Sequence, residues 1–146
     1  MIEIMIVVSA ISLLAALALP SFMKSRRTAQ VTNVINDLRV FRDALNIYAM
    51  NKGKFPDDTE QAPAFPEGSG VEEYLNIDRW SRITALGGHY EWEGPNNHPY
   101  AGIALLGTTA SIEQLTELDK KIDDGDLVTG QFRLTPSERY TFIIEE

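Results

Sequence analysis

The chain opens with the stretch IEIMIVVSAISLLAALALPSF (residues 2–22), which decides its fold. A single acid, Glu3, stands before an apolar run from Ile4 to Met23 that contains no charged residue. Twenty residues of helix rise about 30 Å, which matches the hydrocarbon core of one bilayer. The run therefore predicts a membrane helix, because a helix that is apolar on every side needs apolar surroundings along its whole length.

Two other interpretations fit this run less well. A secretory signal peptide needs a basic start, whereas Glu3 is acidic and no Lys or Arg precedes the run, although Ala16 and Ala18 offer a small-residue cleavage site. The buried helix of a soluble protein needs a large surrounding core. The rest of the chain, about 120 residues, supplies one modest core.

A second helical pattern follows the apolar run. No Gly or Pro lies between Pro20 and Asn51, and Gly53 and Pro56 then supply the signals that end a helix. The apolar positions recur three and four residues apart, as in a helix with one side against a domain: Val31, Val34, Ile35, Leu38, Phe41, Leu45 and Tyr48. A helix continuous through both patterns has about 50 residues and a length of about 75 Å.

Pro20 lies late in the apolar run. Because proline lacks an N–H and clashes with the preceding turn, it predicts a kink or local melting between Leu17 and Pro20. The alternative is that the membrane helix simply stops there. The amphipathic pattern that follows favours a helix that continues.

The remaining residues predict a small α+β head. Its sheet is expected to be antiparallel and to pack on the C-terminal half of the long helix, while the apolar half protrudes. The chain then divides into a membrane or core helix half (1–23), an amphipathic helix half (24–52) and the head (53–146). The expected elements of the head are strands at 87–94, 100–107, 130–135 and 140–146, and a helix at 111–122 with Thr109 or Ser111 as its N-cap.

Composition excludes several classes of function. The chain has 13 Lys and Arg against 21 Asp and Glu, for a formal net charge of −8, which opposes binding to nucleic acid. It has no cysteine, so disulfides, thiolate metal sites and cysteine nucleophiles are absent. No nucleophile elbow and no Gly-rich phosphate loop occurs, so the residues support neither Ser-His-Asp catalysis nor phosphate binding by such a loop.

Two polar clusters are candidates for metal binding. His89, Glu91 and Glu93 alternate along one face of a predicted strand and could hold zinc with His98; the alternative is a solvated face of a sheet whose Tyr90 and Trp92 are buried.

The second cluster surrounds Gly125. Asp123, Asp124 and Asp126 resemble part of a calcium loop, but the full series of ligands is missing, and a solvated turn after a helix is the alternative. The sequence therefore predicts no cofactor, with calcium left open.

The N-terminal pattern resembles the type IV pilins and the pseudopilins of type II secretion. In that family an acid stands near the mature N-terminus, an apolar run follows, and a Pro comes seventeen residues after the acid, which is the separation of Glu3 and Pro20. The likeness covers about the first 50 residues, a third of the chain. The family's acid normally follows four mature residues, whereas Met1 and Ile2 alone precede Glu3. Two mature residues, the methylated N-terminus and a basic leader are therefore expected to be missing from the sequence.

The resemblance implies a filament. Glu3 is then expected to pair with the positive amino terminus of a neighbouring subunit, and Pro20 to permit local melting during assembly; the alternative for Glu3 is a surface acid just outside a bilayer. The filament core is expected to contain Ile4, Ile6, Val7, Val8, Ile11, Leu13, Leu14, Leu17 and Leu19. Some major pseudopilins bind calcium in the head, which is why the aspartates remain candidates.

The resemblance also implies a route to the filament. The subunit is expected to wait in the inner membrane with its head in the periplasm, after cleavage by a leader peptidase. An assembly platform and its ATPase then extract it into an extracellular or periplasm-spanning filament. The expected function is that of a structural subunit of a type IV pilus-like filament, which is not an enzyme. The alternatives are a major pseudopilin of a type II secretion system and a monomeric membrane-anchored binding protein or enzyme.

Overall fold

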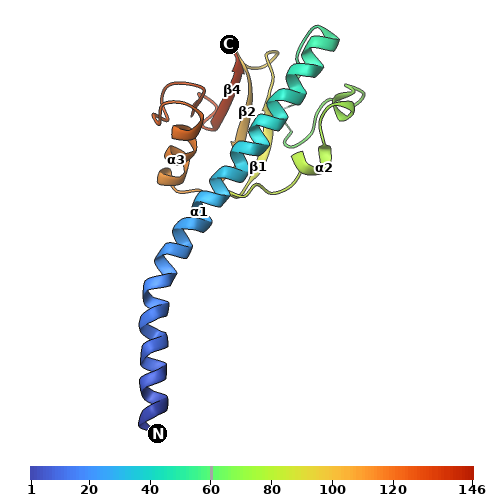
Figure 1. Cartoon of the computed structure of the whole chain (residues 1–146). Helices are drawn as coiled ribbons and strands as arrows, with labels where there is room; N and C mark the ends of the chain where they lie inside the picture. The colour runs from blue at the N-terminus through green and yellow to red at the C-terminus, as the bar shows by residue number, and fades with distance from the viewer. Residues whose placement is uncertain (60) are drawn as a thin grey trace.

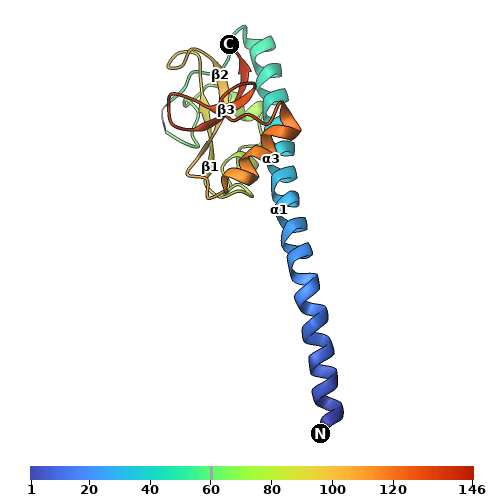
Figure 2. The same cartoon turned by 90° about the vertical axis from the view of Figure 1, so that its left-hand side faces the viewer.

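A single long helix runs the length of the molecule, and the head packs against it. The computed structural model describes residues 1–59 and 61–146, and its helix α1 runs without interruption from Ile2 to Lys52. The head is packed on the C-terminal part of α1, and the N-terminal part extends away from it (Figures 1 and 2). The helix ends at Gly53, which adopts a left-handed φ of 79° and donates its N–H to the Ala49 carbonyl at 2.8 Å. A glycine is needed there because an L side chain rarely adopts that conformation.

The head contains one antiparallel sheet and short helices. The strands are β1 (His89–Glu93), β2 (Ala101–Leu106), β3 (Phe132–Leu134) and β4 (Tyr140–Glu145), and their order in the sheet is β1-β2-β4-β3. The helices are η1 (Val71–Glu73), α2 (Ile77–Trp80) and α3 (Ile112–Ile122). The expected α+β class is confirmed. Arg79 and Trp80 end α2, and residues 81–86 contain no helix or strand.

The core lies between α1 and the sheet. All seven apolar residues predicted on the packed side of α1 are buried, and they are Val31, Val34, Ile35, Leu38, Phe41, Leu45 and Tyr48. The ring of Phe41 meets those of Trp80 and Tyr90 edge to face, each with centroids 5.0 Å apart. Such contacts add to the hydrophobic burial, which is the main source of stability here.

Helix α3 packs beside α1 and is well defined at its start. The Ser111 side chain accepts from the Gln114 N–H, and the Gln114 side chain accepts from the Ser111 N–H, so both halves of a capping box are present. Of the two predicted N-caps, Ser111 is therefore the one used. Leu115 and Leu118 are buried, and Thr28 of α1 donates to the Glu117 carboxylate at 3.1 Å.

Candidate functional site: the protruding half of α1

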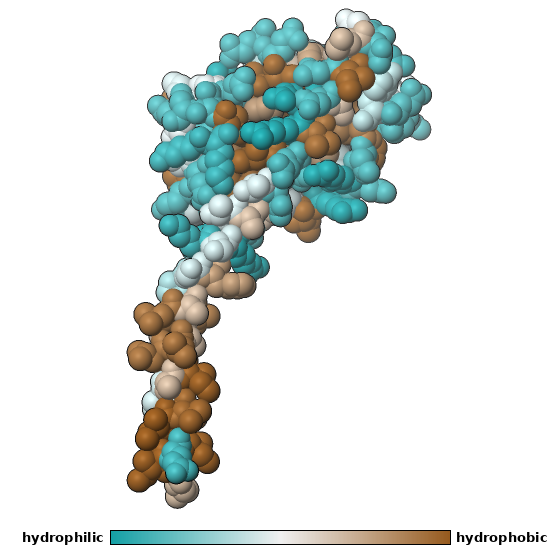
Figure 3. Space-filling model, viewed as in Figure 1, coloured by the Kyte–Doolittle hydropathy of each residue, from teal (hydrophilic) through white to brown (hydrophobic). Residues whose placement is uncertain are grey.

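The N-terminal half of α1 presents apolar side chains on every side. Its most apolar window has a mean hydropathy of 2.5 and no residue buried within the molecule, and α1 is long and apolar enough to cross a membrane. Individual side chains such as Ile2 (75% exposed) and Val8 (56% exposed) point into open space below the head. Figure 3 shows this half as mostly hydrophobic, with one hydrophilic patch near its free end. Such a surface requires lipid or other protein around it.

The polar groups within this surface are satisfied by the helix itself. The Ser9 hydroxyl donates to the Met5 carbonyl and the Ser12 hydroxyl to the Val8 carbonyl, each at 2.8 Å. These bonds let both serines enter an apolar environment without an unpaired donor. Every residue predicted for the filament core lies on this exposed half, and the structure of a single chain does not bring those residues into contact with any partner.

Glu3 lies in the first turn of α1 and is exposed. A carboxylate is favoured there because the N-terminal end of a helix carries partial positive charge. Within the described residues, no cationic side chain forms an ion pair with Glu3. Once apolar groups surround the first turn of α1, the Glu3 carboxylate needs a positively charged partner, because an unpaired charge in such surroundings is costly.

Pro20 is accommodated inside the helix. The helical conformation continues through Leu17 and Pro20, so α1 does not stop there as the alternative interpretation required. Figure 1 shows α1 curving between its protruding half and the half under the head. The isolated subunit has no melted segment at this point.

The loop after α3 contains the aspartates considered for calcium. Asp124 accepts from the Asp126 N–H at 2.8 Å, and Asp126 accepts from the Val128 N–H at 3.1 Å, so these carboxylates shape the turn. Asp123 accepts from the Gln131 N–H at 2.6 Å. In the part of the chain that the structure describes, no three Asp, Glu or His side chains gather as a metal site.

Asp119, in the last turns of α3, is the residue that sequence reasoning missed at this loop. Its side chain is fully buried, and among the described residues neither carboxylate oxygen has a hydrogen-bond partner. Burial raises the pKa of Asp119 to about 6, and the nearby charge of Asp124 adds to this effect. No pattern of neighbours along the chain points to it, because an acid at this position of an amphipathic helix is ordinarily solvated.

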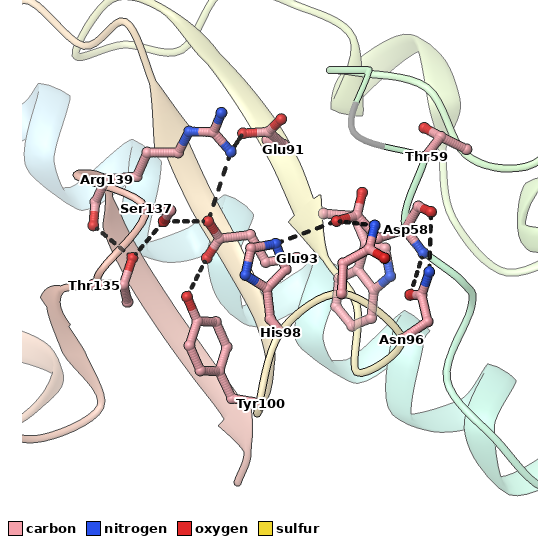
Figure 4. A network of polar contacts seen from close by, with 12 residues as sticks. Asp58, Thr59, Glu91, Glu93, Asn96, His98, Tyr100, Thr135, Ser137 and Arg139 are labelled. Carbon is pink, nitrogen blue, oxygen red and sulfur yellow. Dashed lines mark hydrogen bonds and ion pairs between the residues drawn. The ribbon is translucent and has the colours of Figure 1, made fainter.

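The polar residues of β1 form a buried network rather than a solvated face. Glu93 is fully buried and accepts from three hydroxyls, those of Tyr100 (3.0 Å), Ser137 (2.7 Å) and Thr141 (2.8 Å). The guanidinium of Arg139 forms ion pairs with Glu93, at 3.7 Å, and with Glu91. Figure 4 shows Glu93 of β1 between Tyr100, which precedes β2, and Ser137 and Arg139 of the turn between β3 and β4.

The loop before the head's helices closes the other end of this network. His98 lies 3.3 Å from the Asp58 carboxylate, and the Asn96 side chain accepts from the Asp58 N–H at 2.7 Å (Figure 4).

Burial raises the pKa of Glu91, while the Arg139 charge opposes and the Glu93 charge reinforces the shift. The expectation of a solvated face was wrong for Glu91 and Glu93. Within the described residues, the side chains considered for zinc do not gather as a metal site: His89, Glu91, Glu93 and His98.

These features define a class of protein that consists of one long helix and a small head. The N-terminal half of the helix is apolar and exposed, and its C-terminal half packs against a small antiparallel sheet. The solved structure of the major type IV pilin PilA1 from Clostridium difficile has this fold. It matches 82% of this chain and 97% of the pilin chain with a TM-score of 0.55 at 18% sequence identity. At that identity the likeness shows the fold alone.

Two proteins are also similar to this chain in sequence. Type II secretion system core protein G of Klebsiella pneumoniae is 29% identical over 121 residues, which are 73% of this chain and 81% of the relative. The protein of the same name from Klebsiella michiganensis is 27% identical over 120 residues, 73% of this chain and 80% of the relative. No family model matches the chain. The chain is therefore similar in sequence to type II secretion system core protein G and similar in fold to a type IV pilin.

Proposed function

We propose that this chain is the repeating structural subunit of a type IV pilus-like filament and assembles through the protruding half of α1. The observation that carries the proposal is the exposed apolar surface of residues 2–23, which the head leaves entirely uncovered. Before assembly this half crosses the membrane. In the filament, the same half packs against those of other subunits and forms the core that excludes water.

Glu3 gives this core its register. In a bundle of apolar helices the carboxylate is stable where it meets a positive group, and the amino terminus of a neighbouring subunit is the partner we assign to it. A misplaced neighbour leaves two charges unpaired. The pairing therefore selects one axial position for each incoming subunit.

The major pseudopilin of a type II secretion system is the second candidate. The sequence relatives, both named core protein G of that system, favour it, whereas the type IV pilin shares the fold alone. Deleting the gene separates the two. Loss of protein secretion with cell-surface filaments unaffected supports the pseudopilin, and loss of surface filaments with normal secretion supports the pilus subunit.

For the location and the partners we propose what the resemblance to pilins and pseudopilins implies. The subunit resides in the inner membrane with its head in the periplasm, and a leader peptidase, an assembly platform and an ATPase act on it before and during assembly. The upstream coding sequence tests this route. A short basic leader that ends in Gly is expected, and a coding sequence without one contradicts the proposal.

Electron microscopy of sheared surface or envelope material tests the function directly. Filaments that contain the chain are expected, and Glu3→Ala and Glu3→Leu are expected to abolish or strongly reduce them. The matched control is Glu72→Leu, which removes an exposed acid from the head. If no filaments form at high expression and Glu3→Ala has no effect on function, the chain is a monomeric membrane-anchored protein instead.

Calcium binding beside α3 is a separate proposal for the same subunit. Asp119 fits a cation because it is buried and both oxygens lack hydrogen-bond partners among the described residues, and the Asp124 carboxylate raises its pKa from nearby. Calcium prefers such hard oxygen ligands and would neutralise the repulsion between these acids. We expect calcium to raise the melting temperature of the chain and to have no effect on Asp119→Asn. An equal rise in both proteins contradicts the assignment.

A further inference from the structure

A cavity of about 410 Å³ lies where α1 leaves the head. Pro20, Met23, Lys24 and Arg27 line it from α1, and side chains from the first two turns of α3 line it from the other side. Pro20 and Met23 belong to the end of the apolar run, whereas Lys24 and Arg27 are cations that follow this run directly. The cavity therefore joins an apolar wall to a cationic one.

Two contacts fix how α3 lies along α1. The Thr28 hydroxyl donates to the Glu117 carboxylate at 3.1 Å, and the Lys121 ammonium donates to the Thr32 hydroxyl at 3.5 Å. The second contact lies four residues beyond the first on both helices, which is about one helical turn. The two helices therefore run side by side in the same direction.

The first turn of α3 reaches the end of the apolar run. One turn before these contacts, Lys24 of α1 lies at the level of Glu113 of α3. Met23 then lies at the level of Ile112, which is 59% exposed. Figures 1 and 2 show the start of α3 near the edge of the head from which the protruding half of α1 emerges.

This level coincides with the surface of the membrane that the subunit spans. The apolar run from Ile4 to Met23 is about 30 Å long as a helix, which matches the hydrocarbon core of a bilayer. When the run crosses the bilayer, Met23 lies at the boundary of the hydrocarbon and the cavity lies among the lipid headgroups. The exposed Ile112 side chain then meets lipid instead of water.

We propose that the cavity binds the headgroup of an anionic phospholipid, such as phosphatidylglycerol, from the bilayer that the protruding half spans. Lys24 and Arg27 bind the lipid phosphate, and Met23 and Ile112 contact the first part of the acyl chains. This inference rests on the proposed function, because it needs a subunit that resides in a membrane before assembly. The bound lipid holds the head in one orientation against the bilayer.

The cations at this end of the head favour an anionic lipid. The chain has a formal net charge of −8, so most of its surface is repelled by such lipids. Lys24, Arg26 and Arg27 are exposed, and none of the three forms an ion pair within the part of the chain that the structure describes. Basic residues at headgroup level are attracted to an anionic surface, and an Arg guanidinium can donate two hydrogen bonds to one phosphate.

The acids on α3 do not cancel these positive charges. The Glu117 carboxylate is paired with the Lys121 ammonium at 3.2 Å. Glu113 is the other acid that lines the cavity. A hydrogen bond from Ser111 lowers the pKa of Glu113, and the Arg27 charge adds to this shift. The cations beside the cavity therefore outnumber the acids that are left to neutralise them.

The apolar wall favours a lipid over a free phosphate ion. A free phosphate has no part that contacts Pro20 and Met23. In a phospholipid the acyl chains begin directly below the phosphate, so one molecule contacts the apolar wall and the cationic wall together.

A fluorescent label at Ile112 tests the inference, because the chain has no cysteine of its own. The full chain with Ile112→Cys is labelled with an environment-sensitive dye and reconstituted into phosphatidylcholine vesicles with or without phosphatidylglycerol. With phosphatidylglycerol we expect the emission to shift to shorter wavelength and spin-labelled lipids to quench it. Both effects should weaken without it. The control is Val128→Cys, which is 75% exposed beyond the other end of α3 and should report water in both vesicles.

The outcomes separate this inference from the proposed function. A chain that enters the vesicles while the dye at Ile112 reports water overturns the inference and leaves the membrane-resident subunit standing. Equal effects in both lipid mixtures overturn the preference for an anionic lipid. The same shift on adding inorganic phosphate to the detergent-solubilised chain contradicts a lipid site. A chain that does not enter vesicles at all contradicts the proposed function itself.

A pair of double variants tests the cations directly. Lys24→Gln combined with Arg27→Gln should remove the effect of phosphatidylglycerol on the dye at Ile112. Lys52→Gln combined with Arg82→Gln removes the same charge from exposed positions elsewhere and should retain that effect. Circular dichroism should show the same helical content in both. A full response to phosphatidylglycerol in the first double variant contradicts phosphate binding by Lys24 and Arg27.

Discussion

Glu93 shows how a charged residue is retained in the centre of the head. It is fully buried, but three hydroxyl donors and the Arg139 guanidinium surround its carboxylate. With these hydrogen bonds the Glu93 side chain fixes the positions of its partners. Because Ser137 and Arg139 belong to the turn after β3, the side chain ties that turn to β1.

The first prediction concerns this residue. Glu93→Leu leaves three hydroxyls and part of Arg139 without an acceptor, so it should lower the free energy of unfolding by about 3 kcal/mol. Glu93→Gln keeps one acceptor oxygen and should cost less. Urea unfolding of the full chain in detergent, followed by the fluorescence of the buried Trp80 and Trp92, measures both. Equal losses for the two variants would show that the hydroxyl bonds contribute nothing.

Asp119 makes the head sensitive to pH. Its pKa is raised from 3.8 to about 6, so the folded state holds the proton more tightly than the unfolded state does. Well below pH 3.8 both states are protonated and there is no penalty. As the pH rises through 6, the folded state must carry a buried charge, and stability falls by up to about 3 kcal/mol.

The second prediction follows from that sign. In buffer with EDTA, the melting temperature of the chain should fall between about pH 4 and pH 7 more steeply than that of Asp119→Asn. The variant should be the more stable of the two at neutral pH. Thermal melts across this range measure both effects. Parallel curves for the two proteins contradict the raised pKa.

At the scale of the element, α1 combines two helices with different surroundings in one continuous rod. Residues 2–23 are exposed on every side, while the half under the head buries one side against the sheet and α3. Pro20 lies near the change between them and is tolerated without a break in the helix. Because proline has no N–H, α1 lacks one backbone hydrogen bond at Pro20.

The third prediction concerns the end of α1. Gly53 has a φ of 79° with no described atom within 4 Å of the position its Cβ would take, so a substitution is opposed by the backbone and not by crowding. Gly53→Ala should therefore destabilise the chain by about 1 kcal/mol, and Gly53→Asn by less. Thermal unfolding of the full chain measures both. An alanine variant as stable as the unmodified chain contradicts the role of the left-handed cap.

At the scale of the whole molecule, assembly and folding use different parts of the chain. The core contains residues from Val31 onward, and no side chain of residues 1–23 is buried in it. The protruding half therefore contributes nothing to holding the head together. It is kept for contacts outside the single chain.

The fourth prediction separates these two roles. A chain that starts at Lys24 should be soluble without detergent and keep the folded head, but it should neither enter membranes nor form filaments. Near-ultraviolet circular dichroism reports the packing of the buried aromatic rings, and fractionation reports the membrane association. Loss of the near-ultraviolet signal contradicts the separation of folding from assembly.

The sequence by itself determined the long helix, its apolar half and the packed side of its second half. These are local properties, because helical spacing alone places Val31, Leu38 and Leu45 on one side and Gly53 at the end. The strands and the helix α3 were also predictable from alternation and capping residues. The proposed function began with the same N-terminal pattern, because the spacing of Glu3 and Pro20 that resembles the pilins is itself a property of the linear chain.

Only the tertiary structure decided which acids of the head are buried. Alternation along β1 assigned Glu91 and Glu93 to one face, but that face is covered by a turn more than 40 residues later in the chain. Asp119 is buried for a similar reason, since the loop after α3 folds back over it. Burial depends on which distant segment lies above a residue, and the spacing of neighbours along the chain carries no information about that.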